Sequence, residues 1–282
     1  MQNILELNGV TKHYKDFTLE SVDLALPAGC IMGLIGENGA GKSTAIKLIL
    51  GLIKRDAGRI RLFGREAYQE DKATFEHIGV VLDEPGLHET LRAGEVDATL
   101  RRIYSTWDSE KFKTLCARFG VPMKKQIKEY SHGMKRKLSI AAALSHDSKL
   151  LLLDEATSGL DPVVRDELQD VFLEFIQDET HGILLSSHIL SDLEKISDYI
   201  ALLHGGKLVF SEQKDVLLER FCVLKCSESE LKDISPALIH GVRRNRFGVE
   251  ALVERNCLNR GYVVDAAGIE DIMLFFARGE QK

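Results

Sequence analysis

Hydrophobic and polar residues alternate along the first part of the chain, in three short stretches separated by turn residues. The stretches are ILELNGVTKHY at residues 4–14, FTLESVDLALPAG at 17–29 and CIMGLIG at 30–36. Such alternation is typical of strands with one buried face, and the Gly and Pro residues between the stretches mark turns. We therefore predict three short strands in this part of the chain.

Strand patterns then alternate with helix patterns. Helical spacing runs from Lys42 to Leu52, and strand patterns follow at 58–64 (GRIRLFG) and 77–86 (HIGVVLDEPG). The alternation resumes in strands at 149–156, 182–188 and 199–210, and in helices near 162–180 and 189–197. Apolar strands that alternate with helices predict an α/β fold, with a parallel sheet covered on both faces.

Two segments interrupt this alternation. Between about residues 87 and 144 helical spacing dominates, as in LRAGEVDATLRRIY and SEKFKTLCARFG, and β-branched runs disappear. This pattern predicts a helical insertion in the α/β chain. After residue 220 the periodicity weakens, and we predict that 221–282 form a small α/β appendage to a main domain at 1–220.

Composition and charge narrow the class of protein. The chain has 282 residues, of which 44% are hydrophobic and 28% charged, as in ordinary soluble domains. The formal net charge of −6 gives no bias toward nucleic acid, which we do not expect as a partner. The chain has no apolar run of 18 residues, so no membrane-spanning helix is predicted, and MQNILELNGV lacks the pattern of a signal peptide.

The cysteines are interpreted as reduced thiols rather than as a disulfide framework. They are scattered and odd in number: Cys30, Cys116, Cys222, Cys226 and Cys257. Cys222 and Cys226 have the spacing of half a metal site, but only Cys257 could add a third thiolate and no paired histidines follow.

A phosphate-binding loop follows the third strand pattern. The segment GLIGENGAGKST matches G-x-x-x-x-G-K-[ST], in which backbone N–H groups cradle phosphates and the lysine adds a positive charge. A following helix N-terminus also favours anions, and Ser43 can ligate Mg²⁺. The predicted nucleotide-binding residues are Gly36, Glu37, Asn38, Gly39, Ala40, Gly41, Lys42, Ser43 and Thr44.

Two carboxylates follow a run of four leucines at residues 150–153. The leucines predict a strand buried on both faces, and the carboxyl end of such a strand opens onto the ligand crevice. There Asp154 can reach a magnesium ion, while Glu155 can polarise the attacking water. Asp161 precedes Pro162, so a role in starting a helix is an open alternative for it.

At this point the motifs resemble those of the ATP-binding-cassette (ABC) ATPases, specifically the nucleotide-binding subunits of transporters. The resemblance covers about residues 3–220 and implies the P-loop NTPase fold of that family, with an antiparallel β subdomain at the N-terminus. It implies that Tyr14 stacks on adenine, that His188 in LLSSH is the switch histidine, and that Asp161 ends the D-loop SGLD. In YSHGMKRKLSIAAAL, Ser131 and Gly133 take the phosphate-contacting places of the signature motif.

The resemblance also implies function and partners. It implies an ATPase that uses ATP and Mg²⁺ to power a transporter, with export favoured over import. The expected partners are a separate transmembrane subunit and a second copy or homologous ATPase subunit, whose signature motif meets the γ-phosphate in a head-to-tail dimer. The chain would lie in the cytoplasm, on the inner face of the membrane. A soluble ABC ATPase of translation or DNA repair is the alternative.

This sequence departs from the family pattern at two positions. His132 stands where a second glycine is usual. Asp83 stands where the family has the Q-loop glutamine, so it is either a charged ligand for Mg²⁺ or a cap of the turn before Pro85.

A basic cluster lies around the signature motif, with a spacing that suits a solvated helix face. We interpret it as a solvated helix face, made of Lys124, Lys125, Lys128, Lys135, Arg136 and Lys137.

Overall fold

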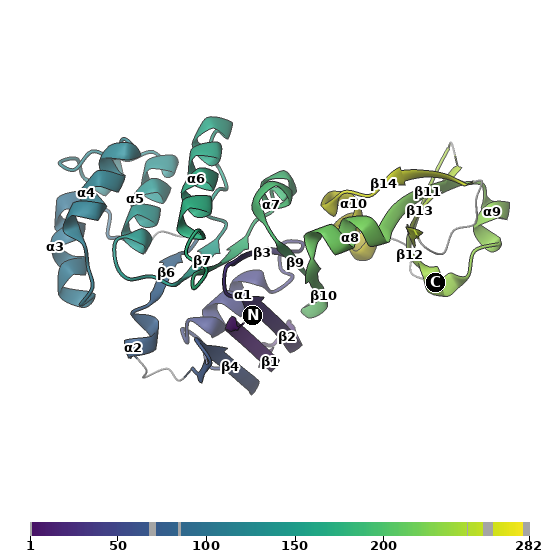
Figure 1. Cartoon of the computed structure of the whole chain (residues 1–282), viewed down its shortest axis with the longest axis horizontal. Helices are drawn as coiled ribbons and strands as arrows, with labels where there is room; N and C mark the ends of the chain where they lie inside the picture. The colour runs from purple at the N-terminus through teal and green to yellow at the C-terminus, as the bar shows by residue number, and fades with distance from the viewer. Residues whose placement is uncertain (1, 68–71, 84–85, 247, 256–261, 279–282) are drawn as a thin grey trace.

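The computed structural model describes residues 2–67, 72–83, 86–246, 248–255 and 262–278. In Figure 1 the molecule is elongated. A group of helices lies at one end, two sheets lie in the middle, and a third sheet lies at the other end. The predicted α/β architecture, with its antiparallel N-terminal sheet, helical insertion and α/β appendage, is confirmed.

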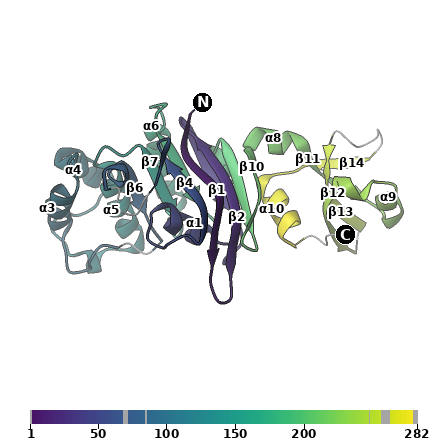
Figure 2. The ribbon, with the colours of Figure 1, turned by 90° about the horizontal axis from the view of Figure 1, so that it is seen from below.

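The N-terminal sheet is antiparallel, with strand order β2-β1-β4-β5. Its strands are β1 (Asn3–His13), β2 (Thr18–Pro27), β4 (Ala57–Leu62) and β5 (Arg65–Glu66). The β1–β2 hairpin projects from the sheet in Figure 2. Its turn carries Tyr14, which places the predicted adenine-stacking residue at the tip of the hairpin.

The central sheet has the order β10-β9-β3-β8-β7-β6, and only the β9–β10 pair is antiparallel. Its strands are β3 (Cys30–Ile35), β6 (Ile78–Val81), β7 (Leu150–Asp154), β8 (Gly182–Ser186), β9 (Tyr199–His204) and β10 (Lys207–Gln213). The strand with the two acids, β7, is not adjacent to β3, which leads into the phosphate loop. Strand β8 lies between them, so its carboxyl end is next to the ends of both strands.

The leucine run of β7 is buried because its side chains alternate between two cores. Leu150 and Leu152 pack with β1, β4 and the helix α1 (Lys42–Ile49). Leu151 and Leu153 face the opposite core, which includes α6 (Pro162–Phe175) and α7 (Leu190–Ile196). A parallel strand covered on both faces has no polar face, so an unbroken apolar run is what it requires.

Three helices form the insertion between β6 and β7. They are α3 (Ala93–Ile103), α4 (Ser109–Arg118) and α5 (His132–Leu144). The short helix α2 (Lys72–Phe75) comes before β6 and is not part of the insertion. A 3₁₀ turn at Ile127–Glu129 leads into α5. The buried residues Phe112, Cys116 and Leu138 join these helices to the core on one face of the central sheet.

Two helices end earlier than their patterns predict. The helix α1 stops at Ile49 rather than near residue 52, and Gly51 follows with a φ of +65° that no continuing helix adopts. The helix α6 stops at Phe175 rather than near 180. There the Asp178 carboxylate accepts the backbone N–H of Thr180 (2.9 Å) and holds a turn instead.

The C-terminal segment folds into a third sheet, with strand order β12-β13-β11-β14. Its elements are α8 (Lys214–Arg220), β11 (Phe221–Cys226), α9 (Glu228–Lys232), a 3₁₀ turn (Pro236–Leu238), β12 (Ile239–Asn245), β13 (Gly248–Glu254), β14 (Val263–Ala266) and α10 (Ile269–Arg278). The helix α10 lies between this sheet and the central domain in both ribbon views (Figures 1 and 2). Its Ile269, Ile272 and Phe275 are buried in the same core as α6 and α7.

Among the described helices, none combines the length and the apolar character needed to cross a membrane.

Candidate functional site

The phosphate loop joins β3 to α1. Its backbone has positive φ at three glycines, Gly36, Gly39 and Gly41. A Cβ at Gly36 would come within 2.3 Å of the Leu203 carbonyl oxygen, so this position has room only for glycine. Asn38, Gly39 and Ser43 are exposed, whereas Lys42 is buried at the first position of α1. The loop therefore offers backbone N–H groups and a hydroxyl to solvent beside a partly desolvated cation.

The turn that carries Tyr14 packs against this loop. A Cβ at Gly41 would lie 3.0 Å from Phe17 Cζ and 2.8 Å from Leu19 Cδ1, so the hairpin and the loop are in contact. Tyr14 is 46% exposed and lies beside Phe17, with ring centroids 6.4 Å apart. The structure thus places an exposed aromatic ring next to the loop, where a base can stack on it.

Lysine 42 folds back over the loop. Its Nζ donates to the carbonyl oxygens of Gly36 (2.7 Å) and Glu37 (3.3 Å). Burial lowers the pKa of the Lys42 ammonium, and the charges of Glu155 and Asp154 oppose that shift. The ammonium and the two acids are therefore close enough to interact, which unites the two motifs in one site.

Serine 186, at the end of β8, orients both acids. Its hydroxyl donates to Asp154 Oδ1 (2.6 Å) and accepts the backbone N–H of Glu155 (3.1 Å). Asp154 is buried, whereas Glu155 has a backbone φ of +52°, which is unusual for a residue with a Cβ. Ser186 was not among the site residues predicted from the sequence. The available signal was a serine at the end of an apolar strand pattern, two residues before His188.

Histidine 188 contacts the second acid directly. Its Nδ1 lies 2.7 Å from Glu155 Oε2. An ionised carboxylate only accepts hydrogen bonds, so beside an ionised Glu155 the Nδ1 would carry the proton and Nε2 would be left to meet a ligand or a water. The structure therefore pairs the predicted water-polarising acid with the predicted switch histidine.

The signature turn, residues 130–134, lies apart from the phosphate loop of the same chain. Ser131 caps α5 by accepting the backbone N–H of Met134 (3.2 Å). A Cβ at Gly133 would lie 3.1 Å from Leu160 Cδ2, and one at Gly159 would lie 3.5 Å from His132 Nδ1. The predicted signature turn thus packs against the predicted D-loop at 158–161, and His132 fits because Gly159 faces it there.

Aspartate 161 is the N-cap of α6. Its carboxylate accepts the backbone N–H of Val164 (3.1 Å), and Pro162 takes the first helical position. This is the helix-starting role that the Asp-Pro pair suggested. Its place at the end of the D-loop stays a prediction.

Aspartate 83 forms an ion pair that was not predicted from the sequence. Its Oδ1 lies 3.1 Å from Nη2 of Arg136, a residue of α5 with no exposed side-chain surface. The reading of the basic cluster as a solvated face is therefore wrong for Arg136. Lys124, Lys125 and Lys128 are exposed as expected, whereas Lys135 and Lys137 are only partly exposed.

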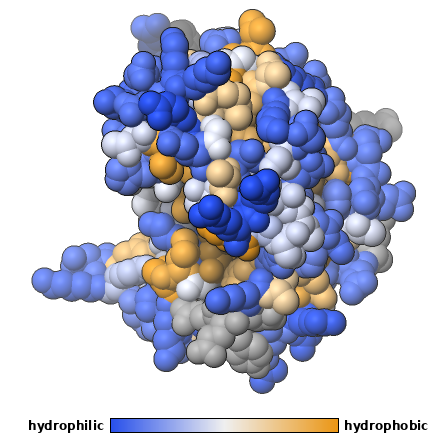
Figure 3. Space-filling model, turned by 90° about the vertical axis from the view of Figure 1, so that its left-hand side faces the viewer, coloured by the Kyte–Doolittle hydropathy of each residue, from blue (hydrophilic) through white to orange (hydrophobic). Residues whose placement is uncertain are grey.

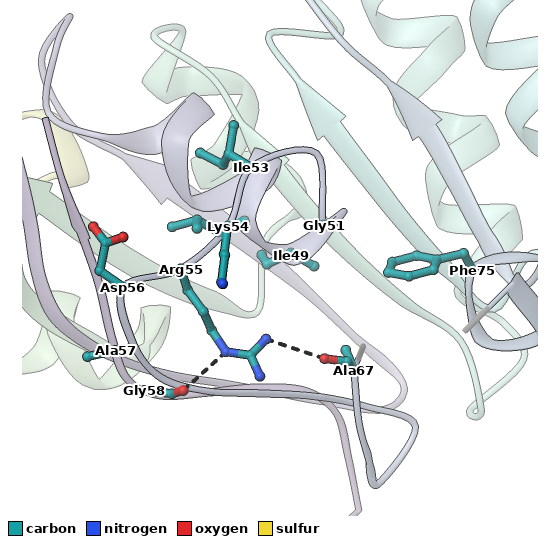
Figure 4. A pocket seen from close by; sticks show the side chains of 11 residues that line it. Ile49, Gly51, Ile53, Lys54, Arg55, Asp56, Ala57, Gly58, Ala67 and Phe75 are labelled. Carbon is teal, nitrogen blue, oxygen red and sulfur yellow. Dashed lines mark hydrogen bonds between the residues drawn. The ribbon is translucent and has the colours of Figure 1, made fainter. Parts of the chain in front are cut away.

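Several hollows lie away from the phosphate loop, and two of them lie next to elements that carry the site. One, of about 540 Å³, lies at the C-terminal end of α1, where Arg55 donates to the carbonyl oxygens of Gly58 (3.1 Å) and Ala67 (3.3 Å) (Figure 4). Because Arg55 also pairs with Glu66, we interpret it as a structural brace of the β4–β5 hairpin.

The other hollow, of about 250 Å³, is an apolar cleft between β6 and the helical insertion. Its lining includes Leu82, Leu87, Leu100, Tyr104 and His146. The insertion lies at the end of the molecule seen in Figure 3, where hydrophobic residues form a band across a mostly hydrophilic surface.

The site has the oxygen donors that magnesium prefers. Ser43 supplies an exposed hydroxyl and Asp154 a carboxylate. The described residues contain no cluster of three or more His, Cys, Asp or Glu side chains able to hold a metal by themselves. Magnesium usually takes one or two carboxylates and completes its shell with phosphates and water, so this donor set fits it.

Comparison with known proteins agrees with this geometry. Residues 19–158 match the ABC transporter family. The bacitracin transport ATP-binding protein BcrA of Bacillus licheniformis is 33% identical over 242 residues, which cover 85% of this chain and 78% of BcrA. The lantibiotic transport ATP-binding protein SrtF of Streptococcus pyogenes is 35% identical over 214 residues, which cover 75% and 92% of the two chains.

A solved structure of an ATP-binding subunit of an ABC transporter is 28% identical, with a TM-score of 0.70, and the match covers 75% of this chain and 90% of that one. These relatives favour transport over the alternative of a soluble ABC ATPase of translation or repair. The chain therefore belongs to the ABC transporter family, as an ATP-hydrolysing subunit that powers a membrane transporter.

Proposed function

We propose that the chain drives export of an antibiotic through a separate membrane-spanning subunit. Two relatives are named for the transport of bacitracin and of a lantibiotic, which supports this class of substrate. ATP hydrolysis is supported by the arrangement of the two acids, each of which has its own hydrogen-bond partner: Ser186 for Asp154 and His188 for Glu155. Lys42 completes this group.

Glu155 is the proposed general base of ATP hydrolysis. Its carboxylate accepts a proton from, or orients, the water that attacks the γ-phosphorus, and His188 Nδ1–H holds the carboxylate in place. His188 Nε2 faces the γ-phosphate or the water. The Lys42 ammonium and the loop N–H groups bind the phosphates and stabilise the charge that develops on them.

Magnesium would be held by Ser43 and Asp154 and would offset phosphate charge when bound. Ser186 fixes one oxygen of Asp154, and this bond would leave the other carboxylate oxygen available to hold the metal. Tyr14 would stack on adenine.

The active unit of the proposal is a head-to-tail pair of chains. In Figure 1, α5 lies with the helical insertion at one end, while α1 lies beside the central sheet, so one chain offers the phosphate loop and the signature turn at separate places. A two-fold pair brings Ser131 and Gly133 of each chain to the γ-phosphate on the other, and the N-terminus of α5 favours that anion. The D-loops would line the same interface.

The membrane partner would dock in the apolar cleft between β6 and the helical insertion. Aromatic and aliphatic side chains line this cleft and can receive a short apolar helix. Docking at that cleft would hold the chain on the cytoplasmic face of the membrane.

Substitution of the proposed base tests this function. Glu155→Gln keeps the shape of the side chain but cannot take a proton, so turnover should fall by about 10²–10⁴ while ATP binding persists. Lys42→Ala should instead weaken ATP binding itself. Steady-state ATPase assays and equilibrium binding of ATP separate the two effects, and parental turnover in Glu155→Gln would contradict the assignment.

A further inference from the structure

We propose that the Asp83–Arg136 ion pair is a positioning device that fixes the signature turn relative to the catalytic edge of the central sheet. The proposal rests on the proposed function, because it assumes that Ser131 and Gly133 serve turnover. It gives Asp83 a role other than binding magnesium or capping a turn.

The pair joins two elements that carry different parts of the site. Asp83 lies two residues beyond β6, which pairs in parallel with β7, so it follows the sheet edge where Asp154 and Glu155 lie. Arg136 lies on α5, about one turn after Ser131. The pair thus crosses from the central sheet to the helical insertion close to both motifs.

Arg136 is built into this junction. Its side chain has no exposed surface, although a guanidinium is always charged. Nη1 donates to the Leu82 carbonyl oxygen (2.7 Å) and Nη2 to Asp83 Oδ1 (3.1 Å), while Nε has no partner among the described residues. Asp83 therefore supplies the only carboxylate that the described contacts give to a fully buried cation.

Two N–H groups of the planar Arg136 guanidinium donate to two consecutive residues, Leu82 and Asp83. This arrangement fixes the rotation of α5 about its axis as well as its distance from the end of β6, which one bond from a lysine would not do. A small rotation there would move Ser131 and Gly133, one turn away, relative to the sheet. The pair would therefore set the place of the signature turn before a second chain arrives.

The same helix offers a matched control. Lys135, the residue before Arg136, pairs with Glu89 (Nζ–Oε1 2.6 Å). The Glu89 and Asp83 carboxylates are equally exposed, at 65% each, but Lys135 retains 21% exposure and can turn to water. Loss of the Glu89 charge should therefore matter little.

The test compares Asp83→Asn, Arg136→Met, their combination and Glu89→Gln. Asp83→Asn leaves the buried guanidinium without its counter-charge, so the melting temperature and kcat should both fall. The double variant replaces the cation by an apolar side chain, so its melting temperature should recover toward the parental value. Its kcat should stay about 10- to 100-fold low, because the link that orients α5 is gone.

The outcome is read from kcat, the melting temperature, ATP binding and the Mg²⁺ dependence of turnover. Binding of ATP by single chains and the Mg²⁺ concentration for half-maximal turnover should stay parental in all these variants, and Glu89→Gln should keep parental kcat. Parental kcat in the double variant would overturn the proposal. A higher Mg²⁺ midpoint in Asp83→Asn, without one in Arg136→Met, would overturn it in favour of a metal ligand.

A Ser131→Arg chain, measured beside them, reports on the proposed function itself. If Ser131→Arg loses turnover and the Asp83–Arg136 double variant does not, the positioning role fails and the signature role stands. If Ser131→Arg hydrolyses ATP at the parental rate, the assumption about the signature turn fails instead.

Discussion

The Ser186 hydroxyl determines how the two acids at the end of β7 are presented. It holds Asp154 through its own proton and Glu155 through the backbone N–H, and the Ser186 carbonyl accepts that same N–H (3.1 Å). A left-handed backbone at a residue with a Cβ costs about 1–3 kcal/mol, and these bonds offset that cost. The strained turn directs Glu155 toward His188 rather than back along the strand.

His146 should make stability depend on pH. It is 6% exposed and stacks on Tyr104 (centroids 4.0 Å apart), and burial lowers its pKa from 6.5 to about 4. Between these values the unfolded chain binds the extra proton, so this contribution is complete above pH 6.5 and is lost as the pH falls toward 4. The difference is about 3 kcal/mol in the free energy of unfolding.

Urea unfolding at a series of pH values from 7 to 4 checks this prediction. The parental chain should lose more stability over that range than His146→Gln, which has no proton to gain. Equal losses in the two chains would contradict it.

The residues found from the sequence and those missed differ in the range of their contacts. Lys42, Asp154, Glu155 and the loop glycines belong to motifs whose spacing along the chain encodes their geometry. Arg136 was assigned to a solvated face because its nearest neighbours in the sequence are lysines. Its partner lies 53 positions earlier and reaches it only through the packing of α5 against the end of β6.

The helix α5 combines a structural and a proposed catalytic role at one residue. Ser131 is its N-cap, and the same first turn would meet the γ-phosphate of the second chain. Aspartate caps helices about as well as serine, whereas alanine costs about 1 kcal/mol. Ser131→Asp should therefore keep parental thermal stability but place a negative charge against the phosphate.

We expect Ser131→Asp to lose at least about tenfold in ATPase rate, because like charges repel strongly in a water-poor site. Ser131→Ala should lose more stability than Ser131→Asp but less activity. Melting temperatures and ATPase rates of the two variants check this opposite order, and a Ser131→Asp chain as active as the parent would rule out the phosphate contact.

Hydrophobic periodicity predicted the strands and helices well but not their neighbours in space. The runs of β7 and β8 indicated buried parallel strands, and both are buried on each face. Their order is set by crossover connections, so the position of β8 between β3 and β7 could not be predicted from either run alone. The ends of α1 and α6 depended on Gly51 and on an Asp178 turn, which periodicity does not detect.

At the scale of the whole molecule, the appendage is joined to the ATPase domain rather than tethered by a linker. Phe221, Ile272 and Phe275 lie in the core that also contains α6 and α7. The helix α7 begins two residues after His188. The appendage therefore packs on the helix that follows His188.

The central claim is that each ATP site is built from the phosphate loop of one chain and the signature turn of another. The measurement that tests it most directly is the ATPase rate of a mixture of Lys42→Ala chains with Ser131→Arg chains. Each variant alone has two defective sites. A mixed pair has one site with both defects and one with neither.

The mixture should recover about a quarter of the parental rate per chain, since about half of randomly formed pairs are mixed and each has one intact site. Melting temperatures of the separate variants control for folding, and native mass spectrometry counts the mixed pairs. A mixture that contains mixed pairs yet hydrolyses ATP no faster than the sum of its two components would contradict the shared site.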